Sequence, residues 1–192
     1  MRIFLTGAAG SIGGEVAQRL VARGHAVIAG VHRNREVRGN SGALVPVASH
    51  ATIDLAAPAL GLAESEAAGI AASHDMIIHC AATVRFDLPE AEYEAINVAG
   101  TAAVLALATR ADLPLLHVST AYVCGTRDGL IGEADPLPAT GFANGYEASK
   151  AAAEALVSAA AHAMSSPGPA SSWATAAPAR SAASIRSMRC SS

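Results

Sequence analysis

The first thirteen residues constrain the fold most, because they join an apolar strand to a glycine-rich turn. The run Arg2-Ile3-Phe4-Leu5 leads directly into Thr6-Gly7-Ala8-Ala9-Gly10-Ser11-Ile12-Gly13. A glycine-rich turn between a first strand and a first helix lets backbone N–H groups approach a pyrophosphate at the helix N-terminus. Such turns also serve as plain strand-to-helix connections, so the residues downstream decide what this one means.

The rest of the chain alternates short aliphatic runs with helical patterns, as a parallel sheet with crossover helices requires. We predict strands over 2–6, 26–31, 44–48, 75–80 and 114–119. We predict helices over 12–23, 61–72, 90–110 and 145–162, with loops over 35–42 and 124–144. The predicted fold is therefore α/β, a Rossmann-like parallel sheet with helices on both faces.

A tyrosine and a lysine are spaced for chemistry near the end of this pattern. The only lysine of the chain, Lys150, follows Tyr146 by four residues, and Ser119-Thr120 ends an earlier apolar strand. Residues at i and i+4 share one helix face, so we expect that the cation can lie beside the phenol and lower its pKa from the ordinary value of about 10. The structural alternative is a core tyrosine and a surface lysine.

Together these motifs resemble the extended branch of the short-chain dehydrogenase/reductase superfamily. The family's pattern Thr-Gly-x-x-Gly-x-x-Gly matches residues 6–13, and its Tyr-x-x-x-Lys matches residues 146–150. Within the branch, the segments His79–Phe86, Asn97–Thr101 and His117–Val123 look most like fatty acyl-CoA reductases and thioester reductase domains. The resemblance covers roughly residues 1–160.

The resemblance implies a catalytic set of Asn97, Thr120, Tyr146 and Lys150. Thr120 would hydrogen-bond the reacting carbonyl, and Tyr146 would donate a proton as hydride arrives. Lys150 would also position ribose hydroxyls. Asn97 would help to hold the lysine and the ribose, although a surface asparagine is the alternative. Ser119 is expected to support Thr120.

The resemblance also implies a nicotinamide dinucleotide, and its contacts fall on Thr6, Gly7, Gly10, Ser11, Ile12, Gly13, Arg33, Asp54, Leu55, Ala81, Ala82 and Lys150. The second strand ends near Arg33 and Arg35 without an acid, which favours the 2′-phosphate of NADP over NAD. A solvated loop is the alternative there, and a turn cap is the alternative for Asp54.

For His79, and for Arg85 and Phe86, a purely structural role is an alternative to a functional one. We expect His79 to be a hydrogen-bonded core histidine rather than a catalytic one. Arg85 and Phe86 are placed to border a substrate entrance, with packing of an exposed loop as an equal alternative.

The implied activity is NADP-dependent reduction of a thioester or aldehyde carbonyl by hydride transfer, with a small-molecule carbonyl or an acyl thioester as substrate. A sugar-nucleotide epimerase or dehydratase, or a hydroxysteroid-type dehydrogenase, would use the same residues. A truncated, catalytically dead nucleotide-binding fragment is the alternative of another class. The sequence leaves the oligomeric state undetermined.

Composition and charge argue against several other classes of protein. A net charge of −3 gives no electrostatic footprint for nucleic acid, and no uncharged apolar run of about 18 residues predicts a membrane span. Because the first strand is predicted to begin at Arg2, we expect no signal peptide. The three cysteines lack metal-ligand spacing, so we expect reduced thiols, no metal and a cytoplasmic protein.

The last thirty residues have a different composition from the rest. Residues 163–192 contain no Leu, Val, Asp, Glu or Phe, and 17 of the 30 are Ala or Ser. We therefore predict a domain over 1–162, incomplete on its C-terminal side, followed by a disordered low-complexity tail over 163–192. The tail is either natural or the product of a frameshift near 158–163, because GC-rich codons for it permit a family-like segment in another frame.

Overall fold

The computed structural model describes residues 1–132 and 135–165. The predicted tail lies outside the described residues except for its first three, which continue the last helix. Within the described ranges, no helix is long and apolar enough to cross a membrane.

Five parallel strands form one sheet in the order β3-β2-β1-β4-β5. Their bounds are β1 Arg2–Thr6, β2 Ala26–Val31, β3 Ser49–Thr52, β4 Met76–His79 and β5 Leu115–His117. Four of the five predicted strands are confirmed within two residues. Because all strands run the same way, their carboxyl ends meet at one edge of the sheet.

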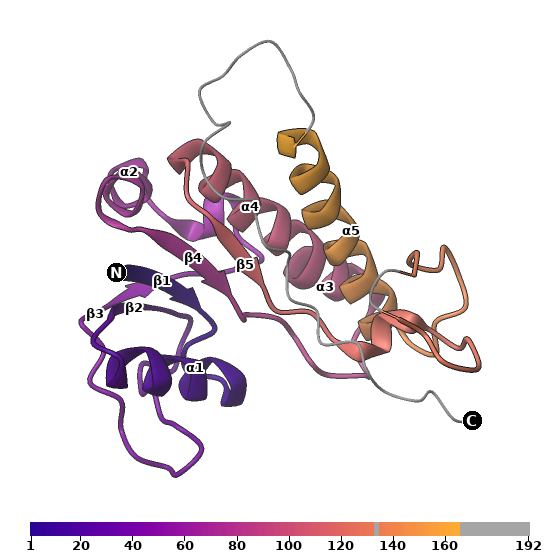
Figure 1. The fold of residues 1–192 in the computed structure, drawn as a ribbon, viewed down its shortest axis with the longest axis horizontal. Coiled ribbons are helices and arrows are strands. Elements are labelled where there is room, and N and C mark those ends of the chain that lie inside the picture. The colour runs from indigo at the N-terminus through magenta and orange to yellow at the C-terminus, as the bar shows by residue number, and fades with distance from the viewer. Residues whose placement is uncertain (133–134, 166–192) are drawn as a thin grey trace.

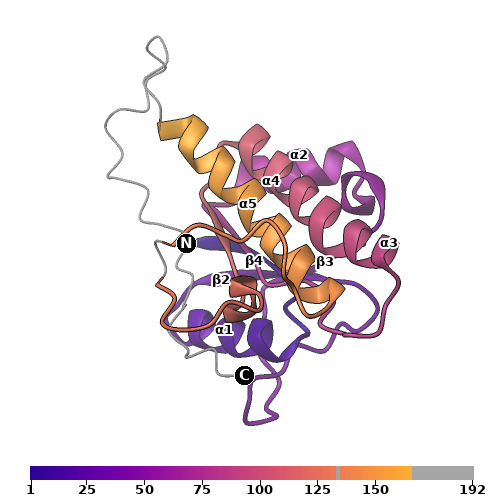
Figure 2. The ribbon, with the colours of Figure 1, turned by 90° about the vertical axis from the view of Figure 1, so that its right-hand side faces the viewer.

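The helices cover both faces of the sheet, as predicted (Figures 1 and 2). The α-helices are α1 Ser11–Ala22, α2 Glu64–Ser73, α3 Glu90–Tyr93, α4 Gly100–Ala111 and α5 Gly145–Ser165. Shorter turns are η1 Pro58–Gly61, the π-helical η2 Glu94–Ala99 and η3 Ala121–Cys124. Helix α1 lies on one face, while α2 and α4 lie on the other with α5 beside α4.

Alternating side chains of the central strands supply two apolar cores. In β1, Phe4 points to the core with α2 and α4, whereas Ile3 and Leu5 point to the core with α1. All three side chains are at most 1% exposed. Burial on both faces explains why β1 reads as a continuous apolar run, as parallel strands do.

The strand predicted over 44–48 is wrong, because the third strand is β3, Ser49–Thr52. Val45 is buried, but as part of a loop that packs on the α1 face, where its N–H binds the carbonyl of Val37. Strand β3 is an edge strand of half-exposed and exposed residues that pairs only with β2. Its sequence therefore lacks the apolar signal that a buried strand carries.

The helix predicted over 90–110 is present as three joined segments, α3, η2 and α4. The middle segment is a π-helix over Glu94–Ala99, and it contains Asn97, which is 1% exposed. Such π-helical insertions are rare and occur frequently at functional sites. The apolar period alone did not indicate this change of helical pitch.

Candidate active site

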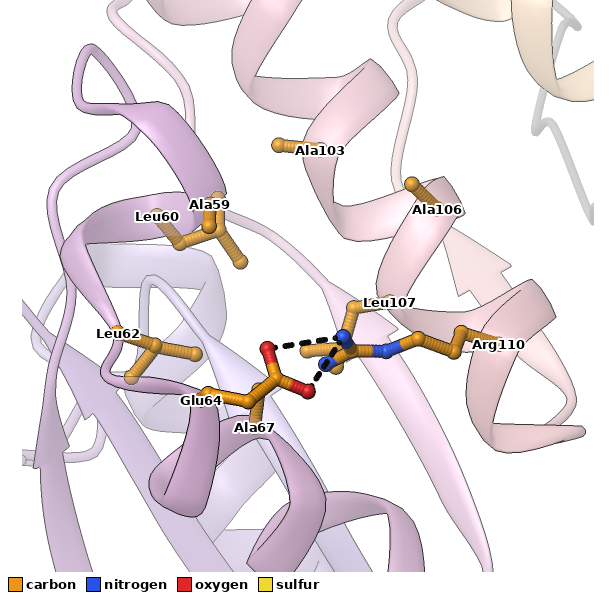
Figure 3. Close-up of a pocket in the computed structure, with 9 residues that line it drawn as sticks. All are labelled: Ala59, Leu60, Leu62, Glu64, Ala67, Ala103, Ala106, Leu107 and Arg110. Carbon is orange, nitrogen blue, oxygen red and sulfur yellow. Dashed lines mark hydrogen bonds and ion pairs between the residues drawn. The ribbon is translucent and has the colours of Figure 1, made fainter.

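The predicted site residues gather at the carboxyl edge of the sheet. The β1–α1 turn, the loop after β4 and the segment after β5 all emerge there, and α5 runs alongside. A hollow between η1, α2 and α4 is lined mainly by apolar side chains, and its lining contains none of the predicted site residues (Figure 3). Glu64 and Arg110 form an ion pair across it, with Arg110 Nη1 2.9 Å from Glu64 Oε1.

Gly7 and Gly13 of the turn lie so close to neighbouring backbone that neither position has room for a side chain. Gly7 has a φ of +71°, and a Cβ there would lie 2.6 Å from the backbone nitrogen of Ala81. A Cβ on Gly13 would lie only 2.1 Å from the carbonyl oxygen of Gly7. These contacts pack the turn against the end of β4 and against the first turn of α1, so both positions exclude a side chain.

Gly10 differs from its two neighbours in the motif. Its φ of −87° suits any residue, and the nearest atom to an added Cβ is the Gly7 oxygen, 3.3 Å away. It is the N-cap of α1, and no side chain caps this helix. The N–H groups of Ser11, Ile12 and Gly13 therefore lack an intrahelical acceptor, as in any first turn, and can bind an anion. The geometry fits a pyrophosphate.

Thr6, a predicted cofactor contact, is 0% exposed. Its hydroxyl oxygen accepts a hydrogen bond from the N–H of Ala81 at 3.3 Å and lies 2.7 Å from His79 Nδ1. Thr6 thus joins the ends of β1 and β4 and fixes the approach of the loop that begins with Ala81 and Ala82. Both alanines are half-buried.

His79 is the hydrogen-bonded core histidine that the sequence led us to expect. It is 1% exposed, and burial holds its pKa well below the ordinary value, so the ring is neutral. Thr101 donates its hydroxyl to the carbonyl of Asn97 at 2.6 Å and is 3.1 Å from His79 Nε2, so it accepts the proton of that nitrogen. His79 Nδ1 then accepts the hydroxyl of Thr6.

The side chain of Asn97 holds two segments together. Its Oδ1 accepts the N–H of Thr83 at 2.8 Å, while its Nδ2 donates to the Thr83 carbonyl and to Ser149 Oγ at 2.9 Å. Asn97 therefore connects the loop after β4 to α5 one residue before Lys150. Among the described residues it makes no direct hydrogen bond to the lysine.

Lys150 points into the protein and is 4% exposed. Its Nζ donates to the carbonyl of Val118 at 2.9 Å and lies 3.5 Å from His117 Nε2. Burial lowers the pKa of the lysine to about 8, although the charge of Glu154 opposes that effect. The interpretation of Lys150 as a surface lysine is excluded.

Tyr146 is buried one turn before Lys150 on α5. Its ring meets that of Phe86 edge to face, with centroids 5.3 Å apart and planes at 85°. Phe86 is 60% exposed, yet its loop is fixed by the Tyr93 hydroxyl, which donates to the Arg85 carbonyl and accepts from the N–H of Leu88. Phe86 is thus an exposed aromatic group held against the tyrosine.

The two neighbouring hydroxyls after β5 have different surroundings. Ser119 donates to Glu154 Oε2 on α5 at 2.5 Å, which ties the segment to the helix. Thr120 is the N-cap of η3, where its Oγ1 accepts the N–H of Tyr122 at 3.4 Å and keeps its own proton to donate. In the described ranges, no hydrogen bond links Thr120, Tyr146 and Lys150 to one another.

The ends of β2 and β3 carry the remaining predicted contacts. Arg33 and Arg35 are exposed, and neither forms a hydrogen bond or ion pair with a described residue. Asp54 accepts the N–H of Ala56 at 2.9 Å, so the turn-capping alternative is present, and its other oxygen is 3.9 Å from His32. Leu55 packs against the start of α4.

Some residues around the site were not predicted as site residues. His117, Ser149 and Glu154 are all at most 6% exposed and touch the active-site segments. The only signal for them was a polar residue at a position that the apolar pattern marks as buried. Their partners are at least 33 residues distant in sequence, which no local motif reveals.

Comparison with known proteins agrees with this geometry. The family described as "Male sterility protein", an NAD-binding family, matches residues 46–168. The chain belongs to this family. It is a family of NAD(P)-dependent oxidoreductases of the extended short-chain dehydrogenase type, which confirms the resemblance, and it includes the thioester reductase-like R domains.

Its curated relatives include biosynthetic enzymes. A 4-hydroxy-2-methyl-3-oxo-4-farnesyl-3,4-dihydroquinoline-1-oxide ketoreductase of Stigmatella aurantiaca is 38% identical over 163 residues, which are 82% of this chain and 45% of that protein. The fumosorinone synthetase of Cordyceps fumosorosea is 34% identical over 186 residues, covering 87% of this chain and 4% of the synthetase. The chain therefore spans less than half the length of these relatives.

Solved structures share the fold. The terminal R domain from the myxalamid PKS-NRPS biosynthetic pathway has a TM-score of 0.73 at 30% identity, covering 84% of this chain and 46% of that one. A UDP-galactose 4-epimerase has a TM-score of 0.67 at 28% identity, covering 84% of this chain and 52% of the other.

Proposed function

We propose that this chain binds NADP across the carboxyl edge of its sheet and reduces a thioester or aldehyde carbonyl held by Thr120 and Tyr146. The observation that carries the proposal is Gly10. Of the three motif glycines it is the one at which an added Cβ would be least hindered, with the Gly7 oxygen 3.3 Å away, and no side chain caps the helix N-terminus where it stands. A bound pyrophosphate supplies the reason for a glycine there.

The preference for NADP over NAD rests on the end of β2. Arg33 and Arg35 are exposed and unpaired among the described residues, and the neighbouring acid Asp54 is engaged by its own turn. A guanidinium binds a 2′-phosphate through charge-assisted hydrogen bonds, whereas NAD sites use an acid to bind the ribose hydroxyls.

The chemistry assigned to the chain is proton delivery and carbonyl positioning. The nicotinamide, when bound, supplies the hydride. Tyr146 donates the proton to the carbonyl oxygen, and Lys150 lies one turn further along α5. Thr120 accepts the N–H of Tyr122 through its hydroxyl oxygen and can donate its hydroxyl proton to the same substrate oxygen. Ser119 is committed to Glu154 and serves as support.

The substrate class follows from the relatives and from Phe86. One relative is named a ketoreductase, and one similar structure is a terminal R domain of a PKS-NRPS pathway. Phe86 presents an exposed apolar ring beside Tyr146, which suits the apolar group attached to a carbonyl. The sugar-nucleotide alternative is favoured by no comparable contact at the described site.

Fluorescence of NADPH titrated with the protein tests cofactor binding, and absorbance of the reduced ring tests turnover with an acyl-CoA or a medium-chain aldehyde. We expect saturable binding, and turnover that Tyr146→Phe lowers by about 100-fold or more while NADPH affinity is kept. Binding without turnover on any carbonyl would restrict the function to nucleotide binding. Failure to bind either NADPH or NADH would overturn the proposal.

A further inference from the structure

His117 lies at the carboxyl end of β5 with its ring inside the active-site wall. It is 2% exposed, its Nε2 lies 3.5 Å from Lys150 Nζ, and its ring centroid is 5.3 Å from that of His79. The following residue, Val118, offers its carbonyl to the same Nζ at 2.9 Å. Two consecutive residues thus contact the lysine ammonium from the end of one strand.

The chemistry of the pair determines where the proton of the imidazole lies. A lysine ammonium has three donors and no lone pair, so His117 Nε2 is the acceptor and the ring proton is on Nδ1. The ring is neutral, because burial and the nearby charge of Lys150 lower the pKa of His117 to about 3. Its Nδ1 has no hydrogen-bond partner in the described structure.

The other groups around the ammonium do not replace this acceptor. His79 is neutral and uses both ring nitrogens on threonines, and burial raises the pKa of the Cys80 thiol to about 11. Glu154 lies one turn further along α5, accepts the hydroxyl of Ser119 and acts on Lys150 through its charge.

We propose that His117 is a positioning residue for Lys150, a neutral imidazole that, together with the Val118 carbonyl, occupies two of the three ammonium donors and leaves one for the ligand. The role of that third donor, binding the cofactor ribose beside Tyr146, rests on the proposed function. The contacts of the first two donors with His117 and Val118 are independent of the proposed function.

Three substitutions of His117 distinguish the effect of its acceptor nitrogen from the effect of the volume of its ring. His117→Gln places an amide oxygen about where Nε2 lies, and His117→Asn carries the same group one methylene short of it. His117→Leu fills the space without an acceptor. If the leucine variant fails to fold by circular dichroism, the Gln and Asn pair still makes the comparison, since both are neutral amides.

Lys150 is the only lysine in the chain, so lysine-selective carbon-13 labelling reports its titration by NMR without assignment. We expect the pKa of Lys150 in His117→Gln to match the parent. In the Asn and Leu variants it should shift by about one, downward if Nζ stays buried without its acceptor and upward if Nζ turns to solvent. Nitrogen-15 labelling of histidine should show a proton on Nδ1 of His117.

The same variants are titrated with NADPH. We expect affinity within about threefold of the parent for Gln and about tenfold weaker binding for Asn and Leu. Equal behaviour of the three variants in the lysine titration, or a proton on Nε2 of His117, would overturn the assignment. If the parent itself binds no NADPH, the proposed function fails while the lysine titration still decides the role of His117.

Discussion

The glycine turn and the Lys150 pocket lie at the same edge of the sheet, but they are built in opposite ways. In the turn, Gly7, Gly10 and Gly13 contribute no side chains, and the backbone packs so closely that a Cβ added to Gly13 would lie 2.1 Å from the Gly7 oxygen. In the pocket, polar side chains from η2, from α5 and from the end of β5 contact one another through hydrogen bonds. The turn is therefore shaped by close packing of the backbone, whereas the Lys150 pocket is shaped by hydrogen bonds between side chains.

The difference affects how each region tolerates change. In the glycine turn a single substitution should have a large effect, because one added carbon atom would clash with a backbone atom that cannot move aside. In the Lys150 pocket each substitution should lower stability by a moderate amount, because one hydrogen bond contributes about 1 kcal/mol, or somewhat more when it involves a charged group. The predictions below test that contrast, and they run from the largest expected effect to the smallest.

Gly13→Ala and Gly10→Ala add the same methyl group three residues apart. We expect Gly13→Ala to lower the free energy of unfolding by about 3 kcal/mol, because its Cβ would lie 2.1 Å from the Gly7 oxygen. Gly10→Ala should change stability by less than about 1 kcal/mol while weakening NADPH binding about tenfold or more. Urea unfolding and cofactor titration measure both, and equal stabilities would break the contrast.

Thr120→Val and Ser119→Ala remove adjacent hydroxyls with different partners. Loss of the Thr120 hydroxyl should lower kcat about 100-fold, because a donor to the carbonyl oxygen is removed. Loss of the Ser119 hydroxyl should cost about 2 kcal/mol of stability through its bond to Glu154, with kcat changed only a few-fold. A larger loss of kcat in Ser119→Ala would reverse the two roles.

Arg33→Ala combined with Arg35→Ala tests the cofactor preference. The parent should bind NADPH about tenfold or more tightly than NADH, and the double variant should bind the two about equally, because it loses charge-assisted bonds to the 2′-phosphate. Arg23→Ala, an exposed arginine at the end of α1, serves as the matched control. Equal affinities in the parent would show that these arginines are only loop residues.

The smallest effect concerns pH. The pKa of Lys150 is about 8 in the folded protein and 10.5 ordinarily, so the unfolded chain binds more protons between these values. The free energy of unfolding should therefore rise with pH in this window, by about 1 kcal/mol from pH 8 to 9, as the buried ammonium loses its proton.

The comparison with Lys150→Met isolates this term, because the variant should lack the rise. Above pH 9 the Cys80 thiol acts in the opposite direction, since its pKa is about 11 when folded and 9.0 ordinarily. A parent and variant with parallel stability curves from pH 8 to 9 would show that the lysine is not buried.

The turn was predictable from sequence and the pocket was not, for a physical reason. The turn is continuous in the chain, and glycine is the residue that a close backbone approach demands, so residues 6–13 predict their own geometry. The pocket joins His117 to Lys150 and Asn97 to Ser149, pairs that are 33 and 52 residues apart. Tyr146 and Lys150 were recognised because one helix turn places them together.

Errors in the fold prediction have the same origin. The apolar run around Val45 resembled a strand because Val45 is a buried loop residue, whereas the true edge strand Ser49–Thr52 is paired on one side only and needs few apolar residues. The π-helical segment at Asn97 depends on its bonds to Thr83 and Ser149, which hold the asparagine inside the protein. Neither feature has a local sequence signal.

The titration of Lys150 by NMR, with and without NADPH, tests the central claim most directly, because the chain contains one lysine. We predict a pKa near 8 in the free protein and a higher value at saturating NADPH, since ligand oxygens that accept from the ammonium favour its charged form. A pKa at the ordinary value of 10.5 that NADPH leaves unchanged would contradict both the buried lysine and the site assigned to it.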